Sequence, residues 1–113
     1  MAIRALLAAF LFFLAAVPAA ADARDDAKKH VEFGIKVAQL NLWAEAIFQW
    51  ERAAQIDPTY AAAHNNLAIA YEHEGDLAKA RAAYEKALEL EPGTALSKQN
   101  YELFKELNDR TTR

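Results

Sequence analysis

Two prolines, Pro58 and Pro92, stand 34 residues apart, and each closes a stretch of similar sequence. The residues that precede them correspond in kind: Trp50, Ala53 and Ile56-Asp57 before the first, Tyr84, Ala87 and Leu90-Glu91 before the second. A fixed period of this length is typical of helical hairpins that stack on their neighbours. Such stacks present binding surfaces and carry no reaction chemistry of their own, so the period predicts a binding module.

Within each period the apolar spacing is helical. The sets His30, Phe33, Gly34, Val37 and His64, Leu67, Ala68, Tyr71 both follow the spacing i, i+3, i+4, i+7, which predicts one buried face in each first helix. No segment shows the strict alternation of a half-buried strand. We therefore expect an all-α fold of five helices: one from Ala27 that Asn41 ends, one over about 43–55, two on either side of the turn at Gly75-Asp76, and a last one over about 95–108.

The predicted turns contain residues suited to helix ends. Asn41 and Gly75 tolerate the left-handed backbone conformation that ends many helices. Asp76 and Thr94 are candidates to cap the helices that follow them. The residues before Pro58 and Pro92 are expected to leave the helical conformation, because proline disfavours it in its predecessor.

These residues resemble the tetratricopeptide repeat, whose pattern places large and small residues at fixed points of a helix–turn–helix. The matching positions are Phe33, Gly34, Ala46, Trp50, Ala53 and Pro58 in the first repeat and Leu67, Ala68, Tyr71, Gly75, Ala80, Tyr84, Ala87 and Pro92 in the second. The resemblance implies an α-solenoid of two hairpins, residues 27–60 and 61–94, with a C-terminal capping helix over 95–108 and a polar tail over 109–113. Stacks of this kind usually need about three repeats, so the capping helix should be essential.

The capping helix has an apolar side that should cover the second hairpin. That side comprises Leu96, Leu103, Phe104 and Leu107, with Tyr101 beside it. We expect Phe104 and Leu107 to make the main contacts.

Residues 1–21 resemble a secretory signal peptide. Arg4 precedes an unbroken apolar run of 13 residues, 5–17, and small residues follow Pro18. Cleavage is expected after Ala21, with Ala23 as the alternative, and the segment 22–26 is then a flexible N-terminus. The other interpretation is an uncleaved anchor, although the run is shorter than the roughly 20 residues that span a bilayer. Export, with the periplasm as destination, is the predicted localisation.

Charge and cysteine content limit the classes of partner that the protein is expected to bind. Residues 22–113 carry 16 acidic and 12 basic side chains and no basic cluster, which argues against nucleic acid and against an anionic membrane. There is no cysteine, so neither a disulfide nor lipid attachment to an N-terminal cysteine is available. A protein or peptide of unknown identity remains as the expected partner.

The resemblance also implies a concave groove lined by the first helix of each repeat. Its predicted lining is Lys28, Val31, Ile35, Gln39, Ala62, Asn65, Ile69, His73, Leu96, Gln99 and Leu103. The alternative is that these are ordinary surface residues of a spacer. One subgroup of the family grips a C-terminal carboxylate with basic residues and asparagine, but at those positions only Asn66 fits here. That binding mode is therefore not expected.

No catalytic, metal or cofactor site is predicted. The three histidines lack the i, i+4 spacing that places two ligands on one helix face, although His73 lies between Glu72 and Glu74. Hydroxyl side chains are few and no phosphate-binding loop is present. Trp43 is either a half-exposed binding anchor or a residue that packs under its own loop.

The sequence thus predicts a non-catalytic interaction module that binds a peptide or helix of an envelope-associated partner. The alternative is a homo-oligomeric scaffold assembled through the exposed ends of the stack.

Overall fold

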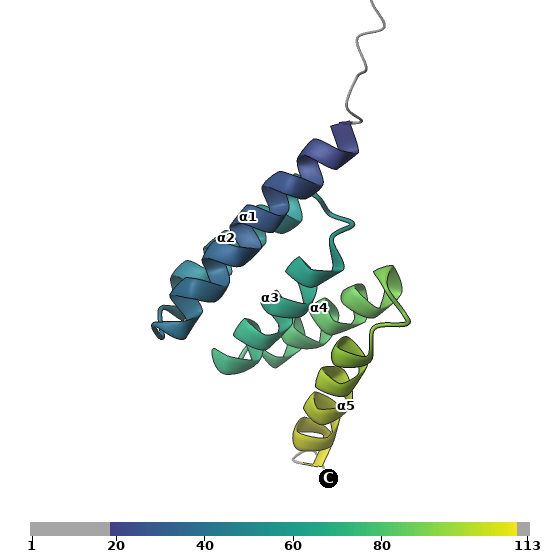
Figure 1. Ribbon diagram of the computed structural model, residues 1–113. Coiled ribbons are helices and arrows are strands. Elements are labelled where there is room, and N and C mark those ends of the chain that lie inside the picture. The colour runs from purple at the N-terminus through teal and green to yellow at the C-terminus, as the bar shows by residue number, and fades with distance from the viewer. Residues whose placement is uncertain (1–18, 111–113) are drawn as a thin grey trace, which may run out of the picture.

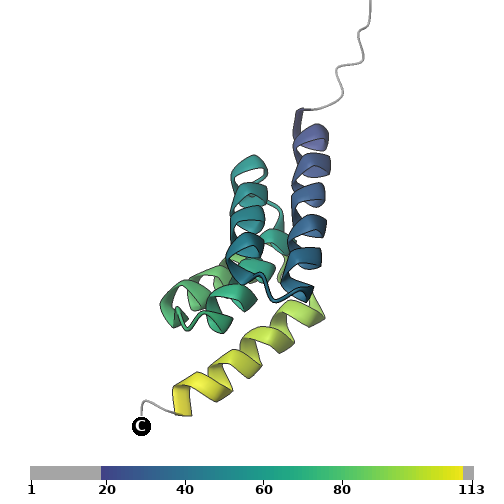
Figure 2. The same cartoon turned by 90° about the vertical axis from the view of Figure 1, so that its left-hand side faces the viewer.

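The computed structural model describes residues 19–110, and within them it contains five helices and no strand. The helices are α1 (Ala19–Gln39), α2 (Trp43–Ile56), α3 (Ala61–His73), α4 (Leu77–Leu90) and α5 (Ala95–Asp109). Figures 1 and 2 show α1 beside α2 and α3 beside α4, with α5 crossing the end of the second pair. The expected all-α stack of two hairpins and a capping helix is confirmed.

The turns within the hairpins follow the sequence prediction. Asn41 has φ 62° and Gly75 has φ 79°, so both residues take the left-handed conformation. Asp76 caps α4, since its Oδ1 accepts a hydrogen bond from the Lys79 backbone N–H at 3.2 Å. Thr94 stands at the N-cap position of α5 as predicted, but its side chain accepts no hydrogen bond from that helix; the hydroxyl donates to Glu91 Oε2 at 3.0 Å.

Small residues let the two helices of each hairpin approach closely. Ala46, Ala53, Ala68, Ala80 and Ala87 are fully buried. In the first hairpin the Trp50 indole lies directly over Gly34, where an added methyl group would overlap the ring. The indole N–H donates to the Val31 carbonyl at 3.1 Å, which fixes the ring against α1.

A tyrosine–glutamate hydrogen bond joins each successive pair of helices after the first. The donors and acceptors are Tyr71 to Glu51, Tyr84 to Glu72 and Tyr101 to Glu85, each at 2.8 Å. These bonds link α3 to α2, α4 to α3 and α5 to α4. We call them the tyrosine ladder.

The capping helix is held by Phe104, which is 1% exposed and lies 5.3 Å from the Tyr84 ring and 5.2 Å from the Arg81 guanidinium carbon. The contact expected from Leu107 is wrong, because that side chain is 56% exposed. Leu96 and Leu103 are also exposed. Because α5 meets only α4 closely, one narrow stripe of its surface is covered and the leucines lie outside it.

The segment 22–26, predicted to be flexible, belongs to α1, which begins at Ala19. Arg24 explains this correction. It forms an ion pair with Asp57 and stacks on the Tyr60 ring with 4.7 Å to the centroid. The helix is thereby tied to the loop before α3. The signal peptide prediction otherwise falls on residues 1–18, outside the described residues, and residues 111–113 of the predicted polar tail lie outside them too.

The buried face of α1 differs from the prediction at Phe33, which is 50% exposed. Leu67 occupies the same repeat position in α3 and is buried, and Tyr101 occupies it in α5 and lies 5.8 Å from Tyr84 of the preceding hairpin. No described helix precedes α1. Phe33 therefore lacks the cover that a preceding hairpin gives to Leu67, whereas Val31 of α1 is buried in the core.

Candidate functional site

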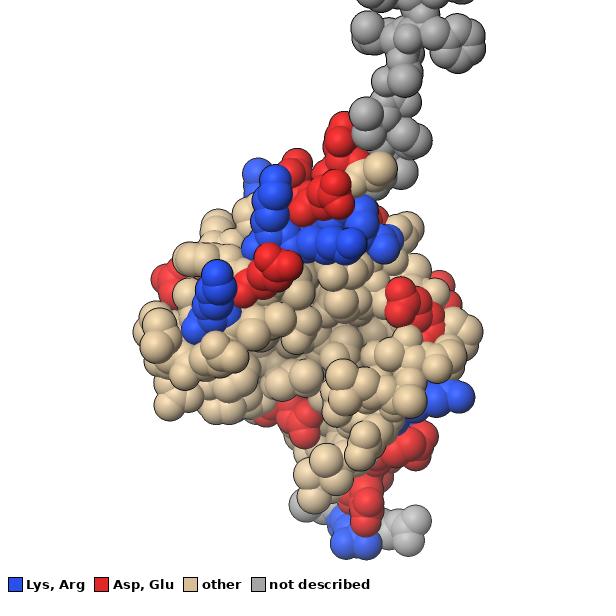
Figure 3. Space-filling model, in the orientation of Figure 1, with Lys and Arg blue, Asp and Glu red and all other residues tan. Residues whose placement is uncertain are grey.

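The first helices of the successive repeats, α1, α3 and α5, share one face of the molecule. Figure 3 views this face and shows that its middle is free of charged side chains, which gather at its margins. Ile35, Ile69 and Leu103 occupy the same repeat position, 34 residues apart, on the three helices. The repeat thus places one aliphatic side chain per helix on this face. Two adjacent hollows lie on it.

The first hollow, which we call the apolar pocket, has a volume of about 340 Å³. It lies between α1, α2 and α3 and is lined by Ile35, Ala38, Gln39, Trp43, Trp50, Asn66 and Ile69. Trp43 forms one wall. Its indole stacks on the His73 ring with 4.2 Å between centroids, and its N–H donates to Asn41 Oδ1 at 3.3 Å. The pocket therefore has a rigid aromatic wall and aliphatic sides.

The second hollow, the polar pocket, has a volume of about 360 Å³ and is lined by residues of α1, α3 and α5 and of the loops before α3 and α5. Its lining is Ile35, Tyr60, Ala61, Ala62, Asn65, Asn66, Glu91, Thr94, Leu96 and Ser97. Ile35 and Asn66 line both pockets, so the two hollows are neighbours across these side chains. Together they form a continuous two-part surface, which we call the groove.

Acidic side chains affect the titration of Tyr60, which lines the polar pocket together with Glu91. Burial raises the pKa of Tyr60, and Arg24 opposes that rise. The carboxylates of Glu32, Glu91 and Asp57 raise the Tyr60 pKa further. A hydrogen bond from the Thr59 hydroxyl lowers the pKa of Asp57 against the effect of its burial, and Arg24 lowers it further.

Asn65 is a buried polar residue of the groove, with 8% exposure. Its Oδ1 is enclosed and has no hydrogen-bond partner in the described part of the chain. Asn66, by contrast, donates from Nδ2 to the Ala62 carbonyl at 2.9 Å and is satisfied within α3. A buried amide oxygen without a partner is uncommon and is a candidate contact for a ligand donor.

The structure brings six of the eleven predicted groove residues to the two pockets: Ile35, Gln39, Ala62, Asn65, Ile69 and Leu96. Val31 is 5% exposed and belongs to the core, which corrects its predicted place on the surface. His73 flanks the apolar pocket through its stack on Trp43. Lys28, Gln99 and Leu103 are exposed but line neither pocket.

Sequence reasoning missed the contributions of Trp43, Tyr60 and Glu91. All three stand at the ends of second helices or in the loops after them, and the repeat pattern assigns the groove to first helices. The Trp43 indole bonds to its own loop, as one of its two interpretations expects, and it also lines the apolar pocket. The sequence offered one signal for the loop residues of the groove: Tyr60 lies two residues after Pro58, and Glu91 lies directly before Pro92.

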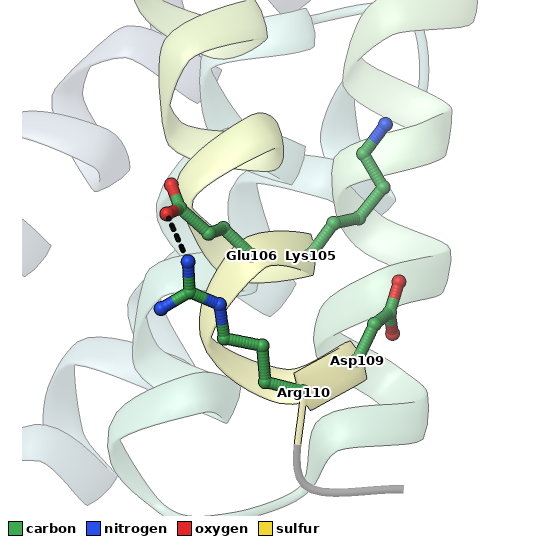
Figure 4. Close-up of a pocket in the computed structure, with 4 residues that line it drawn as sticks. All are labelled: Lys105, Glu106, Asp109 and Arg110. Carbon is green, nitrogen blue, oxygen red and sulfur yellow. Dashed lines mark hydrogen bonds and ion pairs between the residues drawn. The ribbon is translucent and has the colours of Figure 1, made fainter. Parts of the chain in front are cut away.

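A third hollow lies at the end of α5 and is lined by Lys105, Glu106, Asp109 and Arg110. Figure 4 shows Glu106 and Arg110 on one side of the helix and Lys105 and Asp109 on the other. Arg110 pairs with Glu106 at 3.2 Å, and Asp109 with Arg81 at 2.7 Å. Lys105 pairs with Glu102 at 2.8 Å, so each of the four charges already has an ion-pair partner.

Metal-ligating side chains do not gather in groups of three or more anywhere in residues 19–110. His30 Nδ1 lies 2.8 Å from Gln49 Oε1, and His64 Nε2 lies 2.9 Å from the Pro58 carbonyl. His73 Nδ1 lies 3.7 Å from Glu74 Oε1. The first two histidines are partly buried, as the sequence predicted.

Comparison with known proteins gives two family matches. Residues 61–94 match the model described as tetratricopeptide repeat, and residues 38–75 match a model described as TPR repeat. The matched residues, 38–94, make up half of the chain. The boundaries of the first match coincide with those of the second predicted repeat.

The chain is also 35% identical over 60 residues to a mouse protein, "Protein O-mannosyl-transferase TMTC4". The match covers 53% of this chain and 8% of the mouse protein. Within residues 19–110, no helix combines the length and the apolar character needed to cross a bilayer.

Proposed function

Because the chain belongs to the tetratricopeptide repeat family, we propose that it is a non-catalytic interaction module that binds a peptide or helix of a partner protein in the groove. Repeats of this family are typically interaction modules. The transferase activity named for the mouse protein is not part of the proposal, since the chain spans 8% of that protein.

One observation supports the groove as the binding surface. Two open hollows adjoin on the face of α1, α3 and α5, and both have apolar side chains in their walls. Concave sites with apolar walls and a few placed polar groups are the usual form of a recognition site. The indole of Trp43, held by a stack and a hydrogen bond, supplies a rigid aromatic wall of the kind that concentrates binding energy.

We further propose that the protein is exported and that its partner belongs to the cell envelope. The support is the sequence of residues 1–21, with its charged start, apolar run and small residues before Asp22. Mass determination of the N-terminus of the protein recovered from cells tests this. A mature chain beginning at Asp22 or Arg24 is expected, and an intact Met1 would contradict it.

The binding proposal is tested with Ile35→Glu, since Ile35 is 40% exposed and lines both pockets. The matched control is Leu77→Glu, because Leu77 has the same exposed fraction and lies outside both pockets. A partner retained from an envelope extract by the native protein and by Leu77→Glu should be lost with Ile35→Glu. Unchanged thermal melts of both variants would show that the loss is local. Equal retention by all three proteins would overturn the groove as the binding surface.

The second candidate is a homo-oligomer formed through the α1 end of the stack. Phe33 on α1 is 50% exposed, and Leu40, in the turn that follows α1, is 70% exposed. Light scattering over a concentration series should then show dimers, and Phe33→Gln should return the protein to a monomer. A native protein that stays monomeric at the highest concentration would exclude this candidate.

A further inference from the structure

We infer that the groove selects a partner segment in which an apolar side chain lies next to a lysine or arginine. The apolar side chain occupies the apolar pocket and the cation occupies the polar pocket, against Glu91 and the amide of Asn65. The inference rests on the proposed function and adds the chemistry of the partner to it.

The apolar half follows from the composition of the walls. Ile35, Ile69 and the two indoles of Trp43 and Trp50 provide most of the lining, and no charged side chain belongs to it. A charged partner group placed there would lose its hydration and find no counter-charge. The pocket therefore fits a leucine-sized or aromatic side chain.

The cationic half follows from unpaired carboxylates. Glu91 lines the polar pocket, and its only recorded partner within residues 19–110 is the neutral hydroxyl of Thr94. Glu32, exposed on α1, also raises the pKa of Tyr60 and forms no ion pair in that range. A carboxylate in the wall of the hollow without a cationic partner favours a cation and repels an acidic partner.

The arginine that contacts this hollow is already paired. Arg24 stacks on Tyr60, pairs with Asp57 and donates to the Thr59 hydroxyl at 3.3 Å. Lys28 and Lys36 stand one helical turn to either side of Glu32 on α1, so they reduce its field. Glu91 forms no ion pair in the described residues and has no basic residue within four positions in the sequence. Its carboxylate therefore remains available to a cation of the partner.

Asn65 adds an unpaired hydrogen-bond acceptor to the polar pocket. Its Oδ1 is buried without a partner, and its side chain lines the same hollow as Glu91. Lysine and arginine head groups carry donors only, which matches a site that offers a carboxylate and an amide oxygen. A partner carboxylate would bring more acceptors to the same place.

The test begins with random ten-residue peptides displayed on phage and selected on the purified protein. The selected peptides are then synthesised with a fluorescent label, and binding is measured by fluorescence anisotropy. Peptides whose binding is removed by Ile35→Glu should carry a lysine or arginine within three positions of an apolar residue. Replacing that cation by glutamine should weaken binding about tenfold, which corresponds to about 1.4 kcal/mol.

Glu91→Lys is the decisive variant. It should weaken the basic peptides at least about tenfold, because attraction is replaced by repulsion of like charges. It should leave their glutamine versions unchanged. Glu45→Lys is the matched control: it makes the same charge change on an exposed residue of α2 outside both pockets and should have little effect.

Each other outcome has a definite meaning. If the peptides bind in a manner that depends on Ile35 but show no preference for basic residues, the inference is wrong and the proposed function stands. The same holds if Glu91→Lys leaves the affinity unchanged, or if acidic peptides are selected. If no selected peptide depends on Ile35, the proposed function fails and the inference falls with it.

Discussion

The two ends of the stack are built on the same repeat register and differ in what they expose. At the α1 end, Phe33 stands where Leu67 and Tyr101 are covered by a preceding hairpin, and it is half exposed. At the α5 end, Glu102 stands at the repeat position of Gly34 and Ala68. At the α1 end, Phe33 is therefore a large apolar residue, as in an internal repeat. At the α5 end, Glu102 is a charged residue where the other repeats have a small one.

The difference determines where the stack can be extended. A return helix packs on a first helix through the small residue at that position, as Trp50 packs on Gly34. On α5, Glu102 is exposed and pairs with Lys105 at 2.8 Å, so a return helix there would bury an ion pair in place of an alanine. The α5 end therefore terminates the stack, whereas the α1 end remains suited to a further apolar contact.

The strongest way to break the comparison is to remove the terminating helix. A chain that stops after Thr94 should fail to fold cooperatively, because Tyr84 loses the cover of Phe104 and Tyr101 and about three repeats are usually needed for stability. Circular dichroism melts and light scattering measure this. A chain that stops after Arg110 is the control and should melt like the native protein. A cooperative, monomeric melt of the shorter chain would show that α5 is dispensable.

The stability contributed by the two ends of the stack can be compared by truncating one phenylalanine at each end. Phe104→Ala should destabilise the protein by about 3–5 kcal/mol, since it removes a ring that is 1% exposed. Phe33→Ala should cost less than about 1 kcal/mol, because half of that ring is already in water. Urea denaturation of both variants gives the two values. Similar losses would mean that the α1 end is covered in solution, as the oligomer candidate requires.

Most of the fold could be predicted because local signals agreed with the repeat. Asn41 and Gly75 take the left-handed conformation that their residue types favour, and the prolines end the helices before them. Phe33 could not be placed, because i, i+3 and i+4 spacing fits two adjacent faces of α1 equally well. Which face is buried depends on whether a helix precedes it, and the local pattern does not contain that information.

The groove was predictable only in part, for a similar reason. The register placed Ile35 and Ile69 on one face, and the structure lines the apolar pocket with both. The polar pocket depends on how the loop residues Tyr60 and Glu91 meet across α3 and α5. That meeting follows from the angle between hairpins, which no short spacing encodes. The helical state of residues 22–26 depends in the same way on a distant partner, Asp57.

The small residue on the first helix offers a sharper test of the register. Gly34→Ala should destabilise the protein by about 1–3 kcal/mol, since the new methyl group overlaps the buried Trp50 indole and the ring has little room to move. Gly93→Ala is the matched control, because nothing lies within 4 Å of its added carbon. Thermal melts compare the two. An unchanged melt for Gly34→Ala would show that the indole can shift, and that the small residue is not what sets the helix spacing.

The tyrosine ladder also distinguishes the two ends of the stack. It links α2, α3, α4 and α5 through charged acceptors, whereas the hydrogen bonds between α1 and α2 use neutral acceptors. Burial and the bond to Glu51 raise the pKa of Tyr71 to about 12, and burial and Glu72 raise that of Tyr84. A raised folded-state pKa gives stability that is complete below the unfolded value of 10. That stability is lost as the pH rises through 12.

Stability should therefore fall between pH 10 and 12, and Tyr71→Phe should reduce that fall. The same variant should cost about 1–2 kcal/mol at pH 7, where it removes a hydrogen bond to a charged acceptor. Chemical denaturation at both pH values, followed by circular dichroism, measures these effects. At pH 7 the control is Tyr60→Phe, which removes a hydroxyl that donates no hydrogen bond in the described residues and should cost less. A pH dependence that is identical in native protein and Tyr71→Phe would remove the ladder as its cause.

The smallest expected effect concerns the extension of α1 beyond its repeat, which has no counterpart at the α5 end. Arg24→Gln should destabilise the whole protein by about 0.5–1 kcal/mol, because its ion pair with Asp57 is partly exposed. Amide hydrogen exchange should nevertheless accelerate strongly over residues 22–26, since Arg24 ties that turn to the loop before α3. Lys29→Gln is the control: its pair with Asp26 lies on the helix surface and should matter little to exchange. If exchange at 22–26 is already fast in the native protein, the anchor does not hold in solution. The stable part of α1 would then begin where the first repeat begins, without an N-terminal extension.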